Sequence, residues 1–99
     1  FMAEKSQLSI KHNEAESRVE TTVEGRLAEA GYERKPGLIN FTHTNVPKEL
    51  EGRGIAGEMV RAGLDYARAQ KLAVVADCPY VSRFIERHPE YQDLLAPEQ

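Results

Sequence analysis

The chain has 99 residues, of which 40% are hydrophobic and 29% are charged, a composition typical of a soluble globular protein with one hydrophobic core. Its net charge is −3, lysine and arginine do not cluster, and no apolar run is long enough to span a membrane, so we expect neither nucleic acid nor a membrane as a partner. A single cysteine cannot form an intramolecular disulfide, which favours a reducing, cytoplasmic location. We expect one domain over residues 3–97.

The first half of the chain shows the period-two alternation of apolar and polar residues that is typical of β-strands. It predicts four strands, which cover residues 7–11, residues 17–24, a segment that starts at Leu27, and residues 38–46. A polar turn at residues 12–16 separates the first two strands, and Lys35-Pro36-Gly37 ends the third.

The period changes to that of a helix in the second half of the chain. Small or apolar residues recur at helical spacing, at Ala56, Met59, Val60, Gly63, Leu64 and Ala67. The short apolar run at residues 72–76 is typical of a strand that is buried on both faces and pairs in parallel. Pro79 begins a second helix, which Pro89 ends.

Together these elements predict an α+β fold with a mixed sheet: about four mostly antiparallel strands, then a helix, a parallel fifth strand and a C-terminal helix. The fourth strand, the long helix and the fifth strand form one β-α-β unit with a right-handed crossover. Ligands of open sheets bind beyond the carboxyl ends of the parallel strands. Those ends are residues 44–46 and 77–78, and the glycine-rich residues 52–57 lie at the same edge.

Residues 52–57 read Gly-Arg-Gly-Ile-Ala-Gly and match the dinucleotide fingerprint G-x-G-x-x-G, with Asp77 near the distance of a ribose-binding acid. A dinucleotide fold needs these glycines directly after its first strand, followed by further β-α-β units. Here residues 47–51 intervene, and antiparallel strands come first. A P-loop is excluded because no Lys-Ser/Thr follows the glycines. Two interpretations remain: a turn with a loose helix start, or a phosphate site at the N-terminus of the helix.

Four motifs in this order resemble the minimal, single-domain branch of the GNAT superfamily of acyl-CoA-dependent N-acetyltransferases. They are His43-Thr44-Asn45-Val46-Pro47, Gly52-x-Gly54-Ile55-Ala56, Cys78-Pro79-Tyr80 and Arg87-His88-Pro89-Glu90-Tyr91. The resemblance covers nearly the whole chain and is far more specific than the glycines alone. It implies a small N-acetyltransferase that passes acetyl from acetyl-CoA to an amine, which is a small molecule, a lysine or a protein.

The resemblance also implies a place for acetyl-CoA. Backbone N–H groups of residues 52–57 would hold the pyrophosphate, and strands four and five would splay apart so that pantetheine pairs with strand four near Val46. The expected coenzyme A-binding residues are Asn45, Val46, Gly52, Arg53, Gly54, Ile55, Ala56, Gly57 and Tyr80.

Two features of the chain depart from larger relatives. Glu51 stands where they usually have Gln or Arg, which weakens the case for a phosphate contact at that position. They also carry helices between the first two strands that form one wall of the acceptor site, whereas here only the turn at residues 12–16 is available. We therefore expect an open acceptor side with room for a macromolecular amine.

Acetyl transfer to an amine needs a deprotonated amine, a held carbonyl and a protonated leaving thiolate. Many relatives supply the last proton from a tyrosine on the helix after strand five, where this chain offers Phe84 and Ile85. Cys78 ends strand five just before that helix and could accept the acetyl group in a two-step mechanism. The alternative is that Cys78 is a small buried residue that lines the cofactor slot.

His43 is the candidate general base, because histidine exchanges protons near neutral pH. Its ring should share a face with Asn45, or enter the cleft if the strand bulges; the alternative is a histidine bonded to the neighbouring strand. Tyr80 is a second candidate proton donor. His12, in a turn, and His88, at a helix end, have weaker claims, and the histidines and the cysteine lack metal-ligand spacing, so we expect no metal.

Two other classes of function stay open. One is a coenzyme A-binding module without significant turnover, in which Cys78 only lines the slot. The other is an interaction domain whose glycines are incidental. Binding of coenzyme A and transfer of acetyl distinguish the three.

Overall fold

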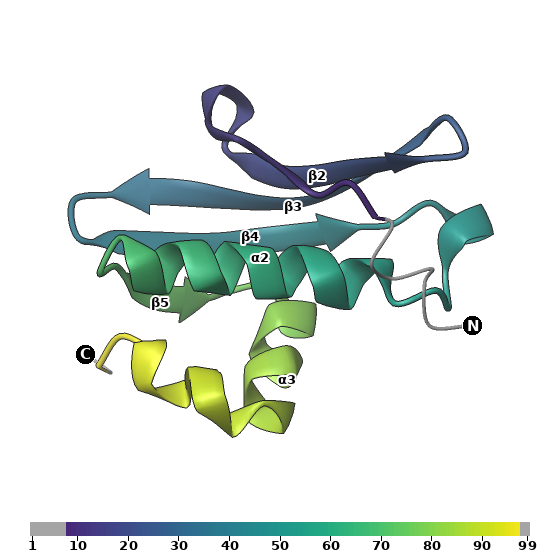
Figure 1. Cartoon of the computed structure of the whole chain (residues 1–99). Coiled ribbons are helices and arrows are strands. Elements are labelled where there is room, and N and C mark those ends of the chain that lie inside the picture. Colours follow the sequence, from purple (N-terminus) through teal and green to yellow (C-terminus); the bar gives the residue numbers. More distant parts are fainter. Residues whose placement is uncertain (1–7, 98–99) are drawn as a thin grey trace.

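A computed structural model describes residues 8–97 of the chain. In this part of the chain, strands and helices follow one another as expected, joined by short 3₁₀ helices (Figure 1). The strands are β1 (Lys11–Asn13), β2 (Arg18–Val23), β3 (Arg26–Lys35), β4 (Leu38–Asn45) and β5 (Ala73–Ala76). The α-helices are α2 (Ile55–Ala69) and α3 (Pro79–Arg87), and the 3₁₀ helices are η1 (Glu14–Glu16), η2 (Lys48–Leu50) and η3 (Pro89–Leu94).

All the strands belong to one sheet with the order β1-β2-β3-β4-β5. Neighbours from β1 to β4 pair antiparallel, and residues 38–41 of β4 pair in parallel with β5. The predicted α+β class with a single parallel pair is therefore confirmed. Because β4, α2 and β5 form a crossover, the end of β4 and the start of α2 meet at one edge of the sheet.

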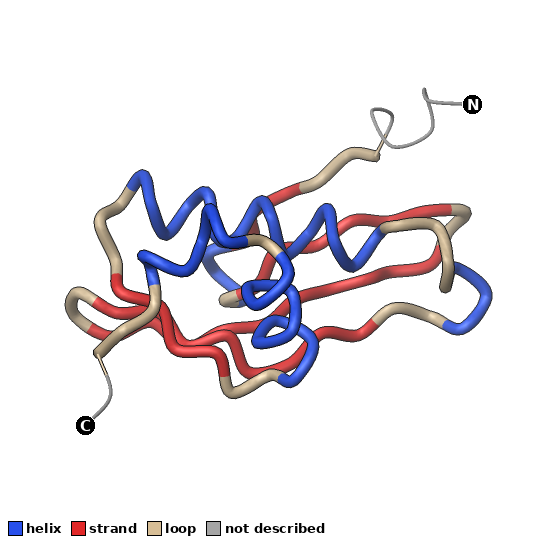
Figure 2. The backbone as a smooth tube through the Cα atoms, turned by 90° about the horizontal axis from the view of Figure 1, so that it is seen from below, coloured by secondary structure: helices blue, strands red, loops and turns tan. Residues whose placement is uncertain are grey.

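The helix α2 lies along one face of the sheet (Figures 1 and 2). Its buried residues follow the predicted stripe, except that the helix begins one residue earlier, at Ile55, and Ala56 is half-buried. A Cβ at Gly63 would lie 2.8 Å from Cε1 of Phe41, so the missing side chain lets the ring of Phe41 approach the helix. The buried side of α3 joins the same core through Val81, Phe84 and Ile85.

The opposite face of the sheet is largely open. Its side chains are half-buried or exposed, with Leu27 at 40% exposure, and no helix within residues 8–97 covers it. The prediction that β5 is buried on both faces is therefore wrong. Val74 is fully buried, but Ala73 and Val75 are half-buried because no helix in the described part of the chain covers their face of the sheet.

The first strand differs most from its prediction. β1 pairs with β2 only at Lys11–Asn13, so His12 lies in the strand and not in a turn. The half-buried Leu8 and Ile10 precede β1 and pack on the core, which explains their alternation without strand pairing. The turn is η1, where the Asn13 side chain accepts a hydrogen bond from the N–H of Glu16 at 3.1 Å. Gln7 and residues 3–6 of the expected domain lie outside the described residues.

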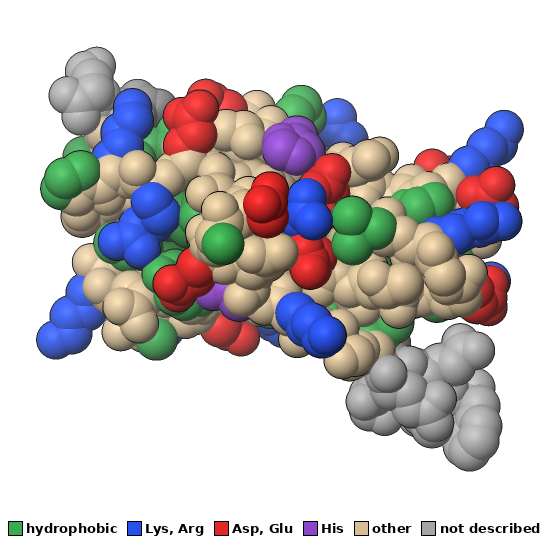
Figure 3. All heavy atoms as spheres, turned by 90° about the horizontal axis from the view of Figure 1, so that it is seen from above, with side chains coloured by type: hydrophobic (Ala, Val, Ile, Leu, Met, Phe, Trp, Pro, Cys, Tyr) green, Lys and Arg blue, Asp and Glu red, His purple; other side chains and the backbone are tan. Residues whose placement is uncertain are grey.

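Charges of both signs intermingle on the face of the molecule that Figure 3 shows. Many form ion pairs, including Arg18–Glu20 at 2.6 Å and Arg68–Asp93 at 2.9 Å. No helix in residues 8–97 is long and apolar enough to cross a membrane.

Candidate functional site

The strands β4 and β5 diverge at a defined point. Their last pair is Phe41 with Ala76, and the N–H of Cys78 donates to the carbonyl of Phe41 at 2.9 Å. Next to this pair, Nδ2 of Asn40 donates to Oδ2 of Asp77 at 2.9 Å. Beyond it, β4 continues along β3 while the chain after β5 turns into α3. The expected opening between the strands thus begins between Phe41 and Cys78.

The glycine-rich loop adopts backbone angles that favour glycine. Gly52 has φ 85°, and Gly54, the N-cap residue of α2, has φ 78°. Another residue in this left-handed conformation costs about 1–2 kcal/mol. Because Gly54 has no side chain to cap the helix, the first N–H groups of α2 are available to an anion.

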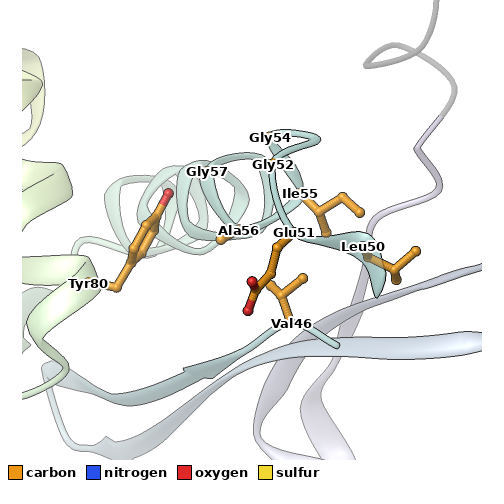
Figure 4. Close-up of a pocket in the computed structure, with 9 residues that line it drawn as sticks. All are labelled: Val46, Leu50, Glu51, Gly52, Gly54, Ile55, Ala56, Gly57 and Tyr80. Carbon is orange, nitrogen blue, oxygen red and sulfur yellow. The ribbon is translucent and has the colours of Figure 1, made fainter. Parts of the chain in front are cut away.

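A hollow of about 280 Å³ lies between the end of β4, the loop and the start of α3 (Figure 4). Its lining residues are Val46, Leu50, Glu51, Gly52, Gly54, Ile55, Ala56, Gly57 and Tyr80. All the residues predicted to bind coenzyme A therefore line it except Asn45 and Arg53. An apolar wall beside exposed backbone N–H groups can hold a ligand with an apolar arm and a phosphate.

Tyr80 closes the α3 side of the hollow. It lies in the first turn of α3, is 41% exposed, and approaches α2 from across the hollow in Figure 4. A Cβ at Gly57 would lie 3.5 Å from its hydroxyl oxygen. Burial raises the pKa of the Tyr80 hydroxyl above its ordinary value, with Arg87 opposing the shift. The hydroxyl therefore keeps its proton at neutral pH and can donate it.

Two charged side chains of the loop lie differently from each other. The carboxylate of Glu51 points toward the Val46 end of the hollow (Figure 4). Nη1 of Arg53 instead lies 2.9 Å from Oε2 of Glu24, in the turn between β2 and β3. This hydrogen bond lowers the pKa of the Glu24 carboxyl. The side chain of Arg53 thus links the loop to the β2–β3 turn through an ion pair.

Cys78 lies where the strands open. It is the N-cap residue of α3, and its Sγ lies 3.4 Å from Oγ1 of Thr44 on β4. Its side chain is only 3% exposed and belongs to the core that contains Phe41. Thr44 was not anticipated as a partner of Cys78, because only the bulge described next turns it toward that side.

His43 lies on the open face of the sheet. Consecutive residues Gly31 and Tyr32 pair with His43 and Phe41, so Thr42 is the extra residue of a β-bulge. After the bulge His43 and Asn45 are both exposed, as expected for residues that share a face. The ring lies over Gly31, whose absent Cβ would come 2.6 Å from Nε2. The strand bulges, but the ring lies on the open face, so the expectation that a bulge would turn it into the cleft is wrong. Nδ1 of the ring lies 3.1 Å from Oγ1 of Thr42 in the same strand and not beside a hydrogen-bond partner in the neighbouring strand. The contact with Gly31 was not anticipated.

The remaining histidines have structural contacts. Nε2 of His12 lies 2.6 Å from the hydroxyl of Tyr32. His88 closes α3 as expected, with its N–H donating to the carbonyl of Ile85 at 3.2 Å and its ring stacked on Phe84. Within residues 8–97, no three His, Cys, Asp or Glu side chains gather into a group that could hold a metal.

Comparison with known proteins gives a family match. A family model described as GCN5-related N-acetyl-transferase matches residues 18–94, which run from β2 to the end of η3. The proteins named NATD1 from Bos taurus and Homo sapiens are 32% and 31% identical to the chain over 62 residues, which is 61% of the chain. The match covers 55% of each of them, so the chain spans about half the length of these relatives.

A solved structure supports the same grouping. The NMR solution structure of a GCN5-like candidate N-acetyltransferase from Staphylococcus aureus matches with a TM-score of 0.73 and 29% identity. The match covers 95% of this chain and 93% of that chain. The two proteins therefore share the fold over nearly their whole lengths.

Proposed function

Because the chain belongs to the GCN5-related N-acetyltransferase family, we propose that it is an enzyme that transfers acetyl from acetyl-CoA to an amine. The observation that carries the proposal is the hollow at the start of α2, where left-handed glycines, helix N–H groups and an apolar wall meet. We assign the activity to one domain over residues 3–97, of which residues 8–97 are described.

Different walls of the hollow fit different parts of coenzyme A. The N–H groups after Gly52 and at the start of α2 would hold the pyrophosphate, since a helix N-terminus favours an anion. The half-buried Val46 and Ala56 supply apolar surface for the pantetheine arm, and the end of β4 supplies backbone groups beside it. Arg53 contributes through its backbone, because its side chain is engaged with Glu24.

We assign acetyl transfer to Cys78. Its sulfur attacks the thioester carbonyl, a new C–S bond replaces the bond to coenzyme A, and the thiol proton passes to the coenzyme A sulfur. The amine nitrogen then attacks the acetyl carbon on Cys78. The C–N bond forms as the C–S bond breaks, and His43 relays one amine proton to the Cys78 sulfur. The position of Cys78 at the opening between β4 and β5 supports this role.

Direct transfer is the competing route, and the position of Tyr80 favours it. In this route the amine attacks the thioester itself, His43 accepts the amine proton, and the Tyr80 hydroxyl protonates the leaving sulfur. Tyr80 lines the hollow and keeps its proton, whereas Cys78 is nearly fully buried. The routes differ in whether an acetyl group is ever bound to Cys78.

The acceptor proposed here is an amine on a macromolecule, such as a lysine of a protein. The 3₁₀ helix η1 and Ser17 form the connection between β1 and β2, and His43 lies on the open face of the sheet. An acceptor site that is open on this face of the sheet admits a side chain of a large substrate. A small amine would gain little contact area there.

The test combines binding and turnover. Coenzyme A, acetyl-CoA and NAD are titrated into the protein by calorimetry, and acetyl transfer is then measured with a panel of small amines and basic peptides. We expect coenzyme A and acetyl-CoA to bind, NAD not to bind, and peptides to be acetylated faster than small amines. Binding without transfer to any acceptor would identify a coenzyme A-binding module, and preferential binding of NAD would contradict the cofactor assignment.

A further inference from the structure

The imidazole of His43 occupies the place that a side chain at position 31 would take. Gly31 faces His43 across the β3–β4 pair, and a Cβ there would lie 2.6 Å from Nε2 and 2.9 Å from Nδ1 of the ring. Gly31 has an ordinary negative φ, so its backbone alone would accept alanine. What requires glycine at this position is the ring of His43.

The bulge brings a second group to the same ring. Thr42, the extra residue of the bulge, places its Oγ1 3.1 Å from Nδ1 of His43 and 3.4 Å from the carbonyl oxygen of Gly31. In a regular strand, consecutive side chains point to opposite faces and could not meet in this way. The bulge therefore creates a cluster of three residues: Gly31, Thr42 and His43.

The hydrogen bonds of this cluster favour one tautomer of the histidine. The Thr42 hydroxyl has one proton and two acceptor lone pairs. If Nδ1 carries a proton, it donates to Oγ1 while the hydroxyl donates to the carbonyl of Gly31, and both contacts are satisfied. If Nδ1 is unprotonated, the hydroxyl can satisfy only one of the two acceptors. The first arrangement makes one more hydrogen bond and leaves Nε2 without a proton.

We propose that Gly31 and Thr42 are positioning residues for His43: the glycine makes room for the imidazole, and the threonine hydroxyl holds Nδ1–H so that Nε2 is free to accept a proton. The placement and the tautomer stand on these contacts alone. Only the identity of the proton donor, the acceptor amine, rests on the proposed function. The ring needs these contacts because an exposed imidazole would otherwise rotate and exchange tautomers.

The tautomer is tested by NMR without any substrate. The chemical shifts of the two ring nitrogens of His43 are measured at alkaline pH, where histidine is neutral, in the wild-type protein and in Thr42→Val, which keeps the branched shape but removes the hydroxyl. We expect the Nδ1–H form to predominate in the wild type and the Nε2–H form to gain population in the variant. A wild-type ring in the Nε2–H form, or a tautomer that Thr42→Val leaves unchanged, would overturn the proposal.

The placement is tested by a double-mutant cycle on kcat/KM for the amine. Gly31→Ala should lower kcat/KM at least about tenfold, because a displaced ring loses part of the rate enhancement that a general base provides. The KM for acetyl-CoA should change little. In a His43→Ala background, where no ring competes for the space, Gly31→Ala should have no further effect. An equal loss in both backgrounds would contradict the proposal.

These measurements separate this proposal from the proposed function. If His43→Ala transfers acetyl at the wild-type rate, the role of His43 as base is wrong, and the NMR result then decides the positioning by itself. Thermal unfolding of each variant controls for stability, and we expect midpoints close to the wild type because His43 is exposed. A fall in the Gly31→Ala midpoint that persists in the His43→Ala background would assign Gly31 a purely structural role.

Discussion

The β4-α2-β5 unit has a closed half and an open half. In the closed half, residues 38–41 of β4 pair with β5, and Phe41 packs against Gly63 of α2. In the open half, β4 leaves β5, the loop turns through Gly52 and Gly54, and the start of α2 faces a hollow. The closed half satisfies its backbone groups internally, whereas the open half leaves N–H groups available to a ligand. Substitutions in the closed half should therefore lower the stability of the protein, whereas substitutions in the open half should lower ligand binding or turnover.

The largest effect is expected at the point where the halves meet. Cys78→Ala should reduce acetyl transfer on the order of 1,000-fold or more, because it removes the proposed acetyl carrier. The affinity for coenzyme A, measured by calorimetry, should stay within a few-fold. Mass spectrometry of the wild type after mixing with acetyl-CoA should show one added acetyl group, absent from Cys78→Ala. Undiminished turnover of the variant would instead establish direct transfer.

The next effect is loss of coenzyme A affinity in the open half. Gly54→Val should weaken coenzyme A binding on the order of 100-fold. It strains the loop and places methyl groups where the phosphate approaches, so the charge-assisted hydrogen bonds between the phosphate and the backbone N–H groups are lost. The matched control is Gly37→Val, with φ 72° and open space around a Cβ, in the β3–β4 turn. Both variants should lose stability through the same kind of backbone strain, since both glycines have a similar positive φ. Equal affinities in the two variants would refute the phosphate assignment.

The closed half should show the opposite behaviour. Gly63→Ala should destabilise the protein by up to about 2 kcal/mol. Its Cβ would meet the Phe41 ring at 2.8 Å in a packed core, a strain of about 1–3 kcal/mol. The higher helix propensity of alanine offsets about 1 kcal/mol of the strain. Chemical denaturation gives the free energy of unfolding, and calorimetry at low temperature should give an unchanged coenzyme A affinity. A weakened affinity in the fully folded variant would show that the halves are coupled.

The smallest effect concerns the charge of the loop. Glu51→Gln should tighten coenzyme A binding about fivefold, because it removes a carboxylate that faces the hollow and repels the phosphates by about 1 kcal/mol. The gain should shrink at high salt, which screens exposed charges. Glu86→Gln, on the exposed side of α3, serves as the control and should change nothing. A weaker affinity of Glu51→Gln would mean that the carboxylate helps to hold the ligand.

Features that depend on local pattern could be predicted from the sequence. The period of apolar residues placed α2 within one residue of its observed start, and the glycines with their downstream motifs indicated the hollow that Val46 and Tyr80 line. The single parallel pair followed from the crossover rule for the β4-α2-β5 unit. These features need no knowledge of which distant residues touch.

Features that depend on register could not be predicted. The bulge at Thr42 moves His43 to the open face and turns Thr44 toward Cys78, and one extra residue in a strand leaves no signature in the amino-acid pattern. β5 is half-buried because no helix among residues 8–97 covers the open face of the sheet, and the apolar run at residues 72–76 carries no information about that face. Similarly, the glycines at positions 31 and 63 make room for the rings of His43 and Phe41, and these ring residues are distant from them in the sequence.

Backbone NMR during a coenzyme A titration tests the central claim most directly. Amide shifts of the wild-type protein are followed as coenzyme A is added, with NAD as the comparison. We predict that the largest changes fall on residues 52–57 and at Val46, with smaller changes at Tyr80 and Cys78, and that NAD has no effect at equal concentration. Changes confined to other parts of the sheet, or none at saturating coenzyme A, would contradict the account.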